Sequence, residues 1–146
     1  MRNILRICLA LGASLTALAA QEPDDAKALQ GIWIPVRAEL GGKPMPDAVL
    51  QTITLKLHKN EYEVSVAGEP EPDLGTWTLD SAAKPKGMKI TGIKGPNAGK
   101  VFPAIYELKP DVLRVCYDLS GTKRPTEFKT SAGTQLYLVT YNRRKK

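Results

Sequence analysis

Residues that could act in catalysis are few and widely separated in this sequence. His58 is the only histidine, and it lies on the polar side of an alternating segment, beside Lys56. Nucleophilic catalysis needs a base next to a serine or cysteine, and a third group that orients the base. The alternation directs His58 to solvent, and no obvious base lies near Cys116. We therefore expect that this protein is not an enzyme.

Two loop segments contain residue types that bind ions, but neither has the spacing that such a site needs. Glu69, Glu71 and Asp73 are close enough in sequence to hold a weak calcium ion, yet prolines separate them and the glycine turn of a calcium loop is missing. Segment 94–100 is rich in glycine and lysine, but Pro96 removes an amide and no Gly-Lys-Ser/Thr helix follows. We expect surface turns at both places, with no metal and no cofactor.

Polar side chains within apolar strands are better candidates, as ligand-binding groups. Tyr106 and Arg114 each lie in a central predicted strand and carry a polar tip. Ligand pockets are mostly apolar, with a few well-placed polar groups. We therefore expect these two residues to contact a small hydrophobic ligand that enters at the end opposite Trp33. The aromatic residues that either line such a pocket or fill the core are Trp33, Tyr62, Trp77, Phe102, Tyr106, Tyr117 and Phe128.

The elements that must position these residues are β-strands. Apolar and polar residues alternate with period two along most of the chain, and glycine and proline interrupt them at short intervals. The predicted strands are 31–40, 52–58, 61–67, 74–79, 88–93, 101–108, 112–119 and 135–141, with short helical turns at 24–29 and 47–51. This pattern favours an all-β fold, an eight-stranded antiparallel up-and-down barrel with a short N-terminal helical turn. A β-sandwich is the alternative.

Four motifs occur in an order and spacing known from one protein family. They are Leu29-Gln30-Gly31-Ile32-Trp33, Gly42-Lys43-Pro44-Met45-Pro46, Ile105-Tyr106-Glu107-Leu108, and Leu113-Arg114-Val115-Cys116-Tyr117 followed by Arg124-Pro125-Thr126-Glu127-Phe128. Together they resemble a lipocalin-like domain family of unknown function, found mainly in exported proteins of planctomycete-type bacteria. The resemblance covers about residues 29–143 and implies a lipocalin-like barrel. It brings no established activity, cofactor or catalytic residue.

The resemblance also implies structural roles for two residues. In lipocalins the tryptophan of Gly-x-Trp closes one end of the barrel, and an arginine after the last strand packs across it. Trp33 matches the tryptophan, and either Arg143 or Arg144 matches the arginine. The last motif contains an arginine and a glutamate, Arg124 and Glu127, and a charged pair of this kind can hold a loop in place. We expect these two to form a structural clamp.

The first 20 residues have the three regions of a secretory signal peptide. Arg2 and Arg6 form the basic start, an apolar stretch follows, and Ala17-Leu18-Ala19 gives the small-residue cleavage pattern. The stretch is short for a bilayer span, which needs about 20 apolar residues, although an uncleaved anchor is the alternative. We expect a secreted or periplasmic protein in which residues 21–146 form one domain.

The expected partners follow from export and from the charge distribution. The net charge is +6, and part of the excess lies in the tail 142–146. We expect a solvated tail, with an anionic lipid or polysaccharide surface as the alternative partner. Export makes nucleic acid a poor partner, and we expect a monomer. Two functions remain open: a binder with its ligand inside the barrel, or an inhibitor-like envelope or extracellular interaction module with a filled barrel.

Export gives the first testable prediction. The mature protein should begin at Ala20 or Gln21, because the cleavage pattern ends at Ala19. N-terminal sequencing of the protein purified from its own host checks this. A soluble cytoplasmic protein that keeps Met1 would contradict it.

Overall fold

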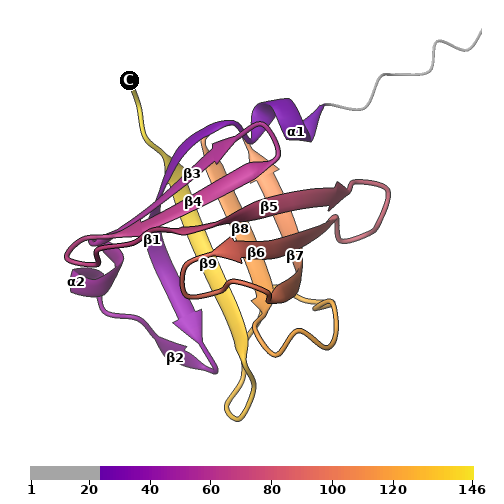
Figure 1. Ribbon diagram of the computed structural model, residues 1–146. Coiled ribbons are helices and arrows are strands. Elements are labelled where there is room, and N and C mark those ends of the chain that lie inside the picture. The colour runs from indigo at the N-terminus through magenta and orange to yellow at the C-terminus, as the bar shows by residue number, and fades with distance from the viewer. Residues whose placement is uncertain (1–23) are drawn as a thin grey trace, which may run out of the picture.

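The alternating segments form strands in the computed structural model, which describes residues 24–146 (Figure 1). The signal peptide and the cleavage site that we predict lie outside the described residues. The strands are β1 (Gly31–Leu40), β2 (Lys43–Pro44), β3 (Ile53–His58), β4 (Glu61–Val66), β5 (Asp73–Asp80), β6 (Gly87–Lys94), β7 (Val101–Lys109), β8 (Val112–Asp118) and β9 (Leu136–Arg143). The short helices are α1 (Asp25–Ala28) and α2 (Asp47–Leu50). All the predicted strands are present, with ends within two residues of those expected.

The sheet follows the chain order and closes on itself. From β3 to β9 each strand pairs antiparallel with the next. β1 pairs with β3 on one side and with β9 on the other, which makes an eight-stranded barrel. The additional strand, β2, pairs only with the end of β1. The predicted lipocalin-like up-and-down barrel is therefore confirmed, and the β-sandwich alternative is wrong, because one continuous sheet surrounds the core.

β1 reaches both neighbours because it bends at a bulge. Its residues 31–33 pair with β3, and residues 33–40 pair with β9, with a register shift between Pro35 and Arg37. Proline has no N–H to donate to a sheet ladder, so within sheets it occurs at edges and bulges. Val36 is the extra residue and is 47% exposed. The bulge thus provides the turn in direction that barrel closure requires.

One end of the barrel is closed by Trp33 and the segments around it. The Trp33 side chain is fully buried, and its indole N–H donates to the carbonyl oxygen of Leu29 at 2.8 Å. The Arg143 guanidinium lies 4.2 Å from the centre of the Trp33 ring. It also donates at 2.6 Å to the carbonyl oxygens of Gln30 and Ala28. Arg143, rather than Arg144, thus occupies the position across the tryptophan, and α1 covers the same end (Figure 1).

The closed end gives a prediction on stability. Trp33→Ala should lower the free energy of unfolding by about 3–5 kcal/mol, because it empties a fully buried position. This is a large share of a typical total of about 5–15 kcal/mol. Urea unfolding measures the change, with Ile93→Ala as a control at a side chain that is 63% exposed. Equal stability of the two variants would contradict the role of Trp33.

Candidate ligand-binding cavity

The interior of the barrel contains a cavity of about 930 Å³. Its wall is mainly apolar and comes from strands β3 to β9. The apolar lining residues are Ile53, Leu55, Leu57, Val64, Met88, Ile90, Val101, Phe102, Leu113, Val115 and Leu119. Most of them face inward because side chains of alternate residues in a strand point to the same face of the sheet. Val101, which is 44% exposed, and Leu119, which follows β8, are the exceptions. The alternation recognised in the sequence therefore builds the apolar wall of this cavity.

The cavity opens at the end of the barrel opposite Trp33. Trp33 pairs with Arg143 at the end of β9, whereas the lining residues Ser120, Gly121 and Gln135 lie in the loop that leads into the start of β9. The exposed Lys100, in the loop between β6 and β7, also lines the cavity. This open end is called the mouth below. The mouth lies on the side at which we expect a ligand to enter.

Asp73 fixes one side of the mouth. Its buried carboxylate accepts hydrogen bonds from the Asn97 side chain at 2.7 Å, from the Asn97 amide at 3.2 Å and from the Tyr62 hydroxyl at 3.3 Å. The Tyr62 ring reaches Asp73 by crossing Gly75, where a Cβ atom would lie 2.4 Å from the ring. Glycine at this position therefore permits the close approach. The network ties β4 and β5 to the loop between β6 and β7.

Three other tyrosines form a polar patch on the cavity wall formed by β8 and β9, called the tyrosine patch below. They are Tyr117, Tyr137 and Tyr141. The rings of Tyr117 and Tyr137 stack with centres 5.8 Å apart, and the Tyr117 and Tyr141 hydroxyl oxygens are 3.4 Å apart. Burial raises the pKa of each of the three phenols above its ordinary value. All three hydroxyls are therefore protonated at neutral pH.

Tyr106 lies at the closed end and does not line the cavity, which corrects the expected ligand contact. Its side chain is 1% exposed, and its hydroxyl donates to the Asp25 carboxylate at 2.7 Å. Lys86 donates to the same carboxylate at 2.8 Å. Burial raises the pKa of Asp25, but these bonds and the Lys86 charge outweigh it, so the net pKa is lowered. Tyr106 thus connects β7 to α1.

Arg114 lies on the outer face of the barrel and does not line the cavity either. It follows Leu113 and precedes Val115, which both face the cavity, so alternation sends Arg114 outward. Its guanidinium pairs with Glu107 at 2.8 Å and lies 4.2 Å from the centre of the Phe128 ring. Arg114 therefore helps to hold the loop between β8 and β9 against the outside of the sheet.

The clamp that we expected in the last motif has a different partner. Arg124 pairs with Asp80 at 3.0 Å, and the structure places no bond between Arg124 and Glu127 within residues 24–146. Its guanidinium packs on Gly87, where a Cβ atom would lie 2.5 Å from Cζ. Arg124 therefore fastens the loop between β8 and β9 to the hairpin of β5 and β6.

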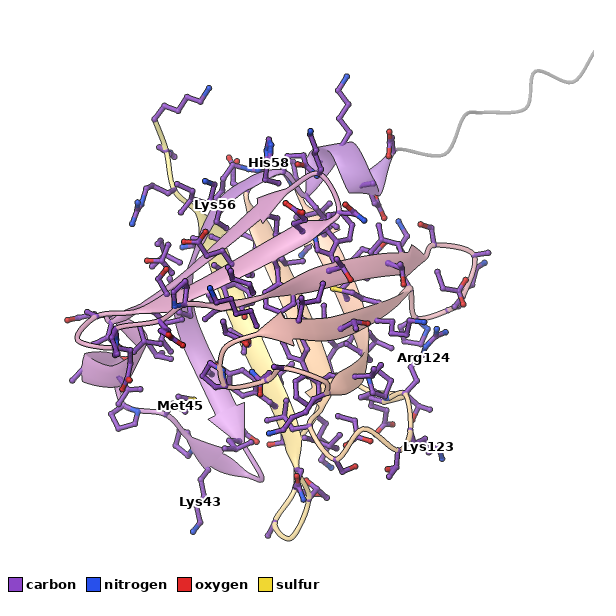
Figure 2. All side chains as sticks on the ribbon, in the orientation of Figure 1. Lys43, Met45, Lys56, His58, Lys123 and Arg124 are labelled. Atoms are coloured by element: carbon purple, nitrogen blue, oxygen red, sulfur yellow. The ribbon has the colours of Figure 1, made fainter. Side chains whose placement is uncertain are left out.

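Other candidate groups are outside the cavity. His58 and Lys56 are exposed on β3, on the side of the molecule near α1 (Figure 2). Cys116 is buried beneath the loop between β8 and β9, and burial raises the pKa of its thiol.

Among residues 24–146, no group of three or more His, Cys, Asp or Glu side chains is placed to hold a metal ion. Within the same part of the chain, no helix is long and apolar enough to cross a membrane.

The sequence reasoning missed Tyr137 and Tyr141 as lining residues. Of the aromatic residues considered for a pocket, Tyr62, Phe102 and Tyr117 line the cavity. The alternation of the last strand could have identified Tyr137 and Tyr141, because both lie on the same face of this strand as the apolar Val139.

Comparison with known proteins gives no relative for this barrel. No family, no curated protein and no solved structure matches the chain. The class of the protein, an antiparallel β-barrel with an internal cavity, therefore rests on its own topology. Membership of the lipocalin-like family stays a prediction.

The loop at the mouth gives a prediction on pH dependence. Asp118 accepts bonds from the backbone amides of Ser120 at 3.0 Å and Lys123 at 2.8 Å. Burial raises its pKa, but these bonds and the Ser120 hydroxyl outweigh it, so the pKa is lowered from 3.8. Asp118→Asn should destabilise the fold at neutral pH by at least about 1 kcal/mol.

The difference between the parent and this variant should shrink in acid. A carboxylate with a lowered folded pKa stabilises the fold above its unfolded pKa, and this contribution is lost as the pH falls through the folded pKa. The gap in unfolding free energy should therefore be complete above pH 3.8 and narrow below it. Urea unfolding at several pH values measures it, with Glu69→Gln as a charge-matched control at an exposed site. A gap independent of pH would contradict the assignment.

Proposed function

We propose that this protein binds a small hydrophobic ligand inside the barrel. The observation that carries the proposal is the cavity of about 930 Å³ with its mainly apolar wall. Ligand pockets typically have volumes of about 300–1,000 Å³ and are lined in this way. Well-packed interiors contain few voids larger than a water molecule. An interior of this size therefore favours a ligand over the filled barrel of an interaction module.

The polar groups of the cavity suit binding rather than catalysis. Lys100 and Asp73 are its charged lining residues, and Asp73 is already engaged by Tyr62 and Asn97. The one histidine, His58, is exposed outside the cavity. We propose accordingly that the protein is a carrier or sensor of an apolar compound, exported and of the lipocalin-like class.

A cavity-filling variant tests this function. The neutral dye N-phenyl-naphthylamine should bind saturably to the parent protein, with increased fluorescence. Val64→Trp should weaken dye binding at least about tenfold, because the larger side chain occupies the cavity that Val64 lines. Ile93→Trp, on an exposed site, is the matched control and should bind as the parent does.

The outcome separates the two functions. Native mass spectrometry of protein purified from its own host should also reveal a bound apolar compound. If no apolar compound binds more tightly than about 100 μM, which corresponds to only about −5.5 kcal/mol, the ligand function is wrong. The interaction module would then replace it.

A further inference from the structure

The tyrosine patch has more hydroxyl protons than the protein accepts. The three hydroxyls carry three protons. A single hydrogen bond, between the hydroxyls of Tyr117 and Tyr141, uses one of these protons. That bond is long, at 3.4 Å between oxygens, compared with the usual range of about 2.5–3.0 Å. Tyr137 also lines the cavity, and no bond joins its hydroxyl to another residue of the described chain. Two O–H donors therefore remain for whatever fills the cavity.

In the described chain no buried side-chain N or O atom lacks a partner, so these donors face the open cavity, and a ligand that covers them without accepting from them is disfavoured. A buried donor without a partner costs about 1–3 kcal/mol. A ligand made only of hydrocarbon would remove water from these hydroxyls without replacing its hydrogen bonds. An oxygen acceptor on the ligand would replace them. The phenol oxygen is the weaker acceptor in such a pair, so an acceptor on the ligand fits the patch better than a donor does.

The ligand that fits is also uncharged where it meets the tyrosine patch. The three phenols are neutral, because the pKa of a phenol is ordinarily near 10 and burial raises it further. Lys100, the cationic lining residue, is exposed at the mouth. The patch itself carries no positive charge, and burying a carboxylate against neutral groups alone is strongly unfavourable.

The stacked rings add a preference for shape. Tyr117 and Tyr137 lie with an angle of 23° between their planes. They come from directly paired positions of β8 and β9, so the sheet fixes their relative placement. Aromatic groups stack favourably on such rings in offset arrangements.

We infer that the ligand is a neutral, planar apolar compound whose carbonyl-type oxygen accepts hydrogen bonds from Tyr137 and from whichever of Tyr117 and Tyr141 does not donate to the other. This inference rests on the proposed function and names the chemical class of its ligand. The apolar body of the compound lies against the aliphatic wall, and its oxygen lies against the patch.

Two matched probes test the inference. Acetonaphthone and ethylnaphthalene, substituted at the same ring position, have nearly the same shape, but only the ketone carries an oxygen acceptor. Each displaces N-phenyl-naphthylamine from the cavity in a competition titration. The two affinities are first corrected for the different free energies with which the probes transfer from water to an apolar solvent. After this correction, the ketone should bind the parent protein about fivefold to tenfold more tightly than the hydrocarbon. This is the effect of about one good hydrogen bond.

Variants that keep the ring and remove the hydroxyl identify the donors. Tyr137→Phe and the double change Tyr117→Phe with Tyr141→Phe should each reduce this preference by at least about threefold. Neither should weaken hydrocarbon binding. Tyr106→Phe is the matched control, because its hydroxyl lies at the closed end and bonds to Asp25. Thermal melting of every variant verifies that the fold persists.

The possible results distinguish the proposed function from the inference about its ligand. If the dye and both probes fail to bind, the proposed function is wrong, and the inference is wrong with it. If the probes bind but show no preference for the ketone, or if the preference survives loss of the hydroxyls, the inference is wrong and the apolar binding function stands. A preference that disappears in the patch variants and persists in Tyr106→Phe supports both.

Discussion

The structure depends on one contact between strands that are distant in sequence, the pairing of β1 with β9. Without it the sheet would have two open edges and no enclosed interior. The bulge at Pro35 and Arg37 bends β1 so that it reaches β9 as well as β3. Arg143 then holds the junction, because it packs on Trp33 and donates to the carbonyl oxygens before β1. The cavity exists because this closure surrounds it.

The buried side-chain network of Asp25 and the mouth of the cavity are placed at opposite ends of the barrel. At the end that contains Trp33, Trp33 and Tyr106 are buried, and Asp25 of α1 accepts hydrogen bonds from Tyr106 and Lys86. Toward the mouth, side chains line a cavity, and side-chain to backbone bonds of Asp73 and Asp118 hold the loops. This separation allows an apolar void without loss of the contacts that maintain the fold.

The fold could be read from the sequence because alternation and turn residues act locally. The strand β2 was not predicted, because a strand of two residues is too short to show alternation. It pairs with β1 only where the Gly41-Gly42 turn reverses the chain. The site residues were harder to predict from the sequence than the strands.

Alternation determines which face of the sheet a side chain is on. The inward-facing Leu113 and Val115 therefore already placed Arg114 on the outer face. Alternation does not settle depth along the barrel axis, and so Tyr106, though inward, lies at the closed end. Depth depends on strand tilt and register, which arise only from the whole sheet.

The position of the C-terminus in this architecture determines how the molecule can be oriented. β9 runs from the mouth to the closed end, so the basic tail after Arg143 leaves the barrel on the far side from the opening (Figure 1). A negatively charged support that captures the tail would hold the molecule with its opening turned outward. The cavity would then stay accessible on the immobilised protein. A tether placed in the loop between β6 and β7 would instead block the passage.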